Sequence, residues 1–164
     1  MISSRLLVIP FVLQVLCMGV DELYYHHQRK LPRWERIGHP LDTLTVLVCL
    51  GWLFFVPPSS SALNIYLGLC FFSCLFVTKD EWVHHQYCSA GEHWMHALQF
   101  VLHSIVLACA GLLWPALHGQ TLTFLHYEGF ERIFFIGNLG LTIWFGLYQL
   151  IYWNFLCRPA PAVK

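Results

Sequence analysis

Carboxylate and imidazole side chains recur at a fixed spacing in two segments of the chain, 20–42 and 79–99. In each segment a glutamate twice precedes a histidine by four residues, giving the pairs Glu22/His26, Glu35/His39, Glu81/His85 and Glu92/His96. Residues four apart lie one turn above each other on a helix, so each pair can present both side chains on one face. Both side chains are good ligands for first-row transition metals. The pattern therefore predicts one composite metal site with these eight residues as ligands.

Chance does not account for this spacing. Nine acidic residues and ten histidines would give roughly 0.5 acid-to-histidine pairs at spacing four in a random chain of this length, whereas the sequence has five. The fifth pair is Asp80/His84, and all five lie in the two segments in matching order. We interpret the two segments as copies of one internal repeat. The alternative is that they are polar helix ends at a membrane surface and bind no metal.

Further candidate ligands lie beside the repeated set, namely Asp21, Asp80, His84 and His103. Helical rotation should point the aspartates away from the predicted ligands, while the spacing leaves open whether His84 or His85 binds the metal. His103 follows His96 by seven residues, on the same helical face but two turns deeper. It is a ligand from below, a residue that supports a ligand, or a histidine that is simply hydrogen-bonded.

The composition is that of an integral membrane protein. Of the 164 residues, 57% are hydrophobic and 11% are charged, whereas soluble domains carry about 25% charge. Apolar runs predict an all-α membrane bundle of five transmembrane helices in a single domain, 1–164. The first four helices should form a four-helix bundle of two repeated hairpins, about 3–56 and 62–115, and the fifth helix should span about 131–157. The apolar run after Arg5 lacks a small-residue cleavage pattern, so we expect it to remain as a helix.

Both segments should lie on the same side of the membrane, because each joins the end of one helix to the start of the next. Seven Lys and Arg residues fall on that side, against Arg5 and Arg132 on the other. The positive-inside rule then predicts a multi-pass protein of the cell (inner) membrane, with the N-terminus outside and the metal site and C-terminus in the cytoplasm. A net charge of +0 gives no reason to expect nucleic acid as a partner.

The ligand pattern resembles that of the ferritin-like di-iron carboxylate proteins, which bind metals in four-helix bundles through Glu and Glu-x-x-His motifs. The segment from Glu81 to His84 matches Glu-x-x-His literally, and the other pairs have a spacing of four. The resemblance covers about 45 residues and implies two bound metal ions, with iron as the metal. The run from Pro32 to Asp42 has the form of a signature of a small multi-pass membrane protein family.

Nitrogen and oxygen ligands without sulfur suit iron or manganese, and zinc is an alternative. Two irons beside an apolar bundle predict an oxygen-dependent oxidoreductase, that is, a hydroxylase, desaturase or oxidase. Its substrate would be a membrane lipid or lipophilic small molecule, and an electron donor would be a further partner. Glu35 and Glu92 are expected to bridge the metals. The alternatives are a zinc-dependent membrane hydrolase that uses metal-activated water, and a non-enzymatic metal-binding or transport protein.

Overall fold

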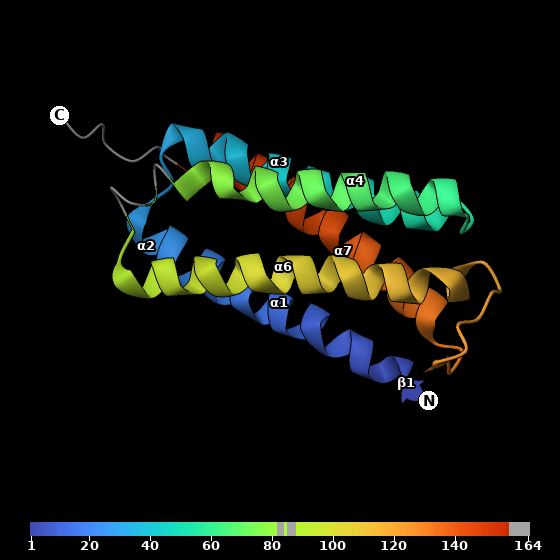
Figure 1. Ribbon diagram of the computed structural model, residues 1–164. Coiled ribbons are helices and arrows are strands. Elements are labelled where there is room, and N and C mark those ends of the chain that lie inside the picture. Colours follow the sequence, from blue (N-terminus) through green and yellow to red (C-terminus); the bar gives the residue numbers. More distant parts are fainter. Residues whose placement is uncertain (82–83, 85–87, 158–164) are drawn as a thin grey trace.

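Long helices that lie along one another make up the computed structural model, which describes residues 1–81, 84 and 88–157 (Figure 1). Within these residues five helices are long and apolar enough to cross a membrane, namely Ser4–Arg29, Arg33–Phe55, Ser60–Lys79, Ala90–Leu117 and Glu131–Leu156. Large apolar side chains are exposed along their outer faces, as they are on helices that contact lipid. The all-α class is confirmed, and five helices suited to membrane crossing agree with the predicted spans.

The first long helix changes its winding where the acidic residues begin. A 3-10 turn, η1 (Ser4–Val8), leads into α1 (Ile9–Val20), which is followed by the π-helix η2 (Asp21–His26) and the short α2 (His27–Arg29). In a π-helix the backbone hydrogen bonds join residues five apart, so the positions that share a face change. The sequence predicts regular helix throughout this region, and the π-helix is a departure from it.

The start of the second long helix is joined to the end of the last by side-chain hydrogen bonds. α3 (Arg33–Phe55) contains Pro40, which has no N–H, so the carbonyl of Arg36 loses its partner within the helix. Asn154 Nδ2 donates to that carbonyl over 3.1 Å. The Arg36 guanidinium in turn donates to the carbonyl oxygens of Trp153 and Cys157. These bonds hold the start of α3 against the end of α7 (Glu131–Ile151) and its π-helical extension η4 (Tyr152–Leu156).

Serine caps begin the third and fourth long helices. The sequence predicts a break between the two hairpins, after residue 56, and the structure has one there. α3 ends at Phe55, and α4 (Ser60–Phe76) starts after Ser59, whose Oγ accepts from the Ala62 N–H. The 3-10 turn η3 (Val77–Asp80) extends α4. Ser89 caps α6 (Ala90–Leu117) in the same way through the Glu92 N–H. Such caps satisfy backbone donors that a helix start leaves open.

The helices pack in an order that the sequence pattern does not give. α1 lies along α6, and α3 lies along α4 and α7. Figure 1 shows α7 running from the end of α6 to the start of α3, so the fifth helix is an integral part of the bundle. An apolar core that includes Leu53, Ala110 and Leu113 fills the end of the bundle far from the two acid and histidine segments. There the short strands β1 (Ile2–Ser3) and β2 (Leu125–His126) pair in parallel.

The described residues of both acid and histidine segments lie at the other end, on the left of Figure 1. There Arg29, at the end of α2, bonds to Glu35 of α3 and Glu92 of α6, and Arg36 of α3 bonds to Trp153 of η4. The helices thus bring the two segments together at one end of the bundle, as the sequence predicts.

Gly146 marks a close approach of α7 to α3. A Cβ added at this glycine would lie 3.0 Å from Thr43 Cγ2, whereas a Cβ at Gly140 of the same helix would meet no atom within 4 Å. We expect Gly146→Val to force the helices apart and to lower the free energy of unfolding by about 1–3 kcal/mol. Gly140→Val is the matched control and should have a much smaller effect in denaturant unfolding in detergent. Equal losses in both variants would contradict this role of the contact.

Candidate metal centre

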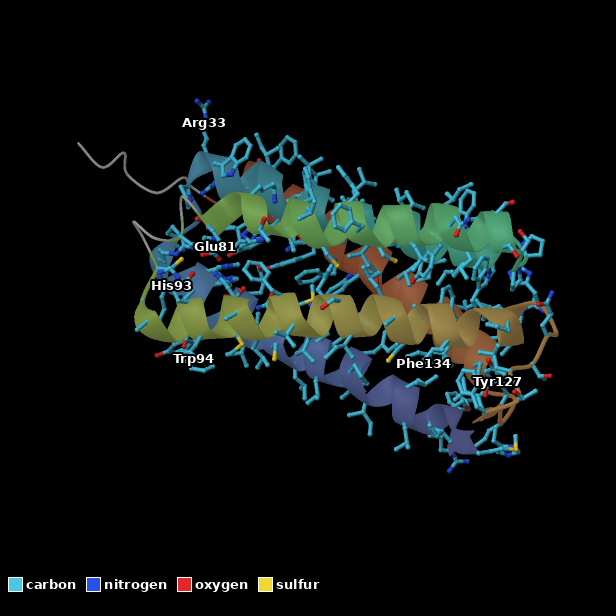
Figure 2. The ribbon with its side chains drawn as sticks, in the orientation of Figure 1. Arg33, Glu81, His93, Trp94, Tyr127 and Phe134 are labelled. Atoms are coloured by element: carbon cyan, nitrogen blue, oxygen red, sulfur yellow. The ribbon has the colours of Figure 1, made fainter. Side chains whose placement is uncertain are left out.

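Seven ionisable side chains are buried together at the end of the bundle where Glu81 and His93 are labelled (Figure 2). Each is at most 5% exposed, and the set comprises Asp21, Glu22, His26, Glu35, His84, Glu92 and His96. His39 lies at the edge of the set, with 15% of its side chain exposed. Five of the eight predicted ligands are therefore in this set, and His39 at its edge is the sixth in the cluster.

Four imidazole rings form a row through the cluster. The ring centroids of His39 and His26 are 4.8 Å apart, those of His26 and His96 are 6.3 Å apart, and those of His96 and His84 are 4.1 Å apart. The rings thus fall into two close pairs with a wider gap between them. His26 and His96 lie in the middle of the row, and His39 and His84 lie at its two ends.

Asp21 lies in the gap between the two pairs. Its Oδ2 is 3.5 Å from His26 Nε2 and 3.3 Å from His96 Nε2, and it accepts a hydrogen bond from Gln99 Nε2. The expectation that helical rotation points Asp21 away is wrong, because that argument assumed an α-helix. In the π-helix η2, residues five apart share a face, and this places Asp21 over His26.

Several buried polar atoms in the cluster make no hydrogen bond with the described residues. They are Asp21 Oδ1, His26 Nε2 and both ring nitrogens of His96. The two Nε2 atoms keep only their 3.5 and 3.3 Å contacts with Asp21 Oδ2. Leaving a buried polar atom without a hydrogen bond costs about 1–3 kcal/mol, so these atoms favour a bound species that is not part of the chain. Possible ligand atoms lie within 4.8 Å of one another in three overlapping groups: His26/Glu35/His39, Asp21/His26/Glu92/His96 and His84/Cys88/His96. This part of the chain could therefore bind a metal ion.

Glu22 supports His26 from behind. Its Oε2 lies 3.1 Å from His26 Nδ1, and its Oε1 accepts from the indole N–H of Trp153. A carboxylate on one ring nitrogen leaves the other free to bind metal, and metal-bound histidines usually have such a partner. The structure thus gives Glu22, predicted as a ligand, the environment of a positioning residue, and it adds Trp153 from η4, which sequence reasoning missed.

Arg29 holds the two glutamates that are predicted as bridging ligands. Its guanidinium donates to both oxygens of Glu35, over 3.1 and 2.7 Å, and to Glu92 Oε1 over 3.0 and 2.8 Å. A carboxylate has about four lone-pair sites, so Glu35 can still bind a metal beside these two bonds. Arg29 is the last residue of α2, and Lys30 after it has a positive φ of 62°. Its sequence position gives no sign that it turns inward.

The cluster carries more negative than positive charge. Four buried carboxylates face two guanidinium groups, that of Arg29, whose side chain is 14% exposed, and that of buried Arg36, which donates to backbone carbonyls. Buried charge is costly unless it is compensated. The excess negative charge therefore favours the binding of cations.

The remaining candidates lie at the rim, outside the cluster or outside the described residues. Glu81 has a side chain that is 44% exposed, with Oε1 3.7 Å from His84 Nδ1. His84 is buried in the cluster, whereas His85 and the side chain of Asp80 lie outside the described part of the chain. His103 is buried away from the row and hydrogen-bonds to Ser73.

Cys88 adds a sulfur atom that the sequence pattern does not predict as a ligand. Its Sγ is grouped with ring nitrogens of His84 and His96. Burial raises the pKa of the Cys88 thiol well above its usual range, so the thiol stays protonated unless a metal displaces the proton. Cys88 lies just before α6, between His84 and His96 in the sequence, and this position could have suggested it as a ligand.

A cavity of about 420 Å³ opens beside the imidazoles, between α1, α3, α6 and α7. Its wall includes all four histidines of the row and Asp21. Apolar side chains make up much of the remaining wall, among them Phe11, Val46, Phe100, Leu107 and Phe145. A ligand pocket of this size and character is typical of sites for small apolar molecules.

Comparison of the chain with protein-family models, with curated proteins and with solved structures found no match. The interpretation of the cluster therefore rests on its own geometry.

Proposed function

We propose that the protein is a membrane enzyme that holds two metal ions, with iron as the metal, and oxidises a lipid-like substrate with dioxygen. The observation that carries this proposal is the placement of Asp21 between two pairs of buried histidines, beside a largely apolar cavity. The pairs suggest one metal each, and Asp21 is the carboxylate that could reach both.

The donor atoms suit iron. His26, His39 and Glu35 form a group of two imidazoles and one carboxylate, which is the donor set of non-heme iron oxygenases. On the other side, His84 and His96 would be completed by Asp21 or Glu92. Manganese uses similar ligands and remains the alternative within this proposal.

The cavity supports a lipid-like substrate, because an apolar molecule in it would lie directly against the histidines. Hydroxylation of a C–H bond consumes one dioxygen, two electrons and two protons, and it yields an alcohol and one water. The two electrons must come from an external reductant, so a one- or two-electron donor is a required partner. The metals would supply the oxygen chemistry, while Glu22 orients His26, Arg29 orients Glu35 and Glu92, and the apolar wall excludes water.

For the membrane arrangement, we propose a multi-pass protein whose metal site faces the cytoplasm. Lys30 and Arg33 are exposed at the cluster end of the bundle, and Figure 2 draws Arg33 extending away from it. Arg36 is buried and the Arg29 side chain is only 14% exposed, which reduces the charge difference on which the orientation rests. The two hairpins of the predicted repeat would share one orientation.

A zinc-dependent hydrolase is the second candidate, and the position of Cys88 favours it. A thiol beside His84 and His96 offers the cysteine and histidine ligands of some catalytic zinc sites, where a metal-bound water attacks the substrate.

The test is oxygen consumption by the iron-loaded, reduced protein in lipid nanodiscs. We expect dioxygen uptake that His26→Ala abolishes, because His26 belongs to two of the three ligand groups. His27→Ala is the matched control: this neighbour bonds to the Glu22 carbonyl and stacks on Tyr152, so uptake should persist. Iron-loaded protein inert to dioxygen, with zinc-dependent ester or amide hydrolysis instead, would overturn the oxidase in favour of the hydrolase.

A further inference from the structure

The cavity beside the histidines is long as well as apolar. Phe11 and His26 both line it from the first long helix, and they are separated by roughly 20 Å at the rise of a helix. The cavity therefore extends from the histidines toward the middle of the bundle. Its shape fits a molecule with a chain, placed along α1.

A buried polar residue lies part of the way along this cavity. His103 lines it and is 7% exposed, and it follows His96 by about 10 Å along α6. Its Nε2 is 3.0 Å from Ser73 Oγ, which is 2.7 Å from Thr45 Oγ1, and Thr45 donates over 2.8 Å to the carbonyl of Asp42.

The end of this chain of hydrogen bonds determines the direction of all of them. A hydroxyl has one hydrogen, and that of Thr45 goes to a carbonyl oxygen, which can only accept. Thr45 Oγ1 must therefore accept from Ser73, and Ser73 Oγ must accept from His103 Nε2–H. In the neutral imidazole the remaining nitrogen, Nδ1, is then an acceptor.

We propose that His103 binds the hydrogen-bond donor of an amphiphilic substrate, such as the hydroxyl of a long-chain alcohol, while the chain lies along the apolar wall. The donor would sit about 10 Å from the metals, so that His103 selects which carbon reaches them. The inference rests on the proposed function, because it names the substrate class of that site.

The test uses metal-free protein in detergent, so that it does not depend on metal binding or turnover. The probes are 1-hexadecanol and 1-methoxyhexadecane, which differ in that the ether has no donor, and bound probe is counted by native mass spectrometry. Wild-type protein should prefer the alcohol by about tenfold, the contribution of one buried hydrogen bond. His103→Phe should bind both probes with little preference.

Two further variants separate this role from a structural one. Ser73→Ala should reduce the preference, because it removes the group that holds Nε2 as the donor. Ser104→Ala on the same helix should keep it, because that hydroxyl bonds to its own backbone. Wild-type protein that binds both probes equally, or neither, would overturn the proposal. A preference retained in both His103→Phe and Ser73→Ala would overturn the assignment to His103.

Discussion

Asp21→Asn is expected to reduce metal binding from the proposed two ions per chain to one at most, with affinity at least about 100-fold lower. Loss of a group that only supports a ligand costs about 10- to 100-fold, and a carboxylate between both histidine pairs should contribute more. Asparagine keeps the volume and can still bond to Gln99, so the variant should fold. The measurement is competition for iron or cobalt against a chromophoric chelator.

Two other substitutions of a carboxylate by an amide make this result specific. Glu22→Gln should weaken binding by about 10- to 100-fold and keep both ions, because Glu22 acts through His26. Glu128→Gln removes a carboxylate paired with Arg5 at the far end of the bundle and should leave binding unchanged. If Asp21→Asn and Glu128→Gln bound metal with equal affinity, Asp21 would not be a metal ligand.

Arg29→Met is expected to destabilise the metal-free protein by about 3–5 kcal/mol, because it leaves Glu35 and Glu92 buried without their cationic partner. The released carboxylates are then available as ligands. Saturating metal should therefore stabilise Arg29→Met more than it stabilises the wild type. The measurement is denaturant unfolding in detergent, with chelator and with metal.

Arg33→Met is the matched control, since this nearby arginine is exposed and points away from the bundle (Figure 2). It should change the free energy of unfolding by no more than about 0.5 kcal/mol. The role assigned to Arg29 would be wrong if the two variants unfolded alike in chelator.

The spacing of residues along a helix correctly predicts the contacts of the site that form within one helix. The pairs Glu22/His26 and Glu35/His39 are four residues apart, and both approach each other in the structure, to 3.1 and 3.9 Å. The meeting of both segments also follows from the sequence, because hairpins of similar length return the chain to the same end. The starts of α4 and α6 follow from the capping serines Ser59 and Ser89, and the break before α4 also follows from its two prolines.

Other features depend on contacts between distant segments or on a change of helix type. Trp153 reaches Glu22 across 131 residues, and no local pattern in η4 indicates that partner. Arg29 resembles any basic residue of a membrane-surface turn, yet it turns inward because two glutamates meet there. The place of Asp21 follows from the π-helix, and a period of 3.6 residues predicts the wrong face for it.

Elemental analysis of wild-type protein purified without chelator tests the central claim most directly. Two histidine pairs that share Asp21 predict close to two metal ions per chain, with iron as the main metal. Protein that is folded and contains no bound metal, even after exposure to iron, manganese and zinc, would contradict the claim that this cluster is a metal centre.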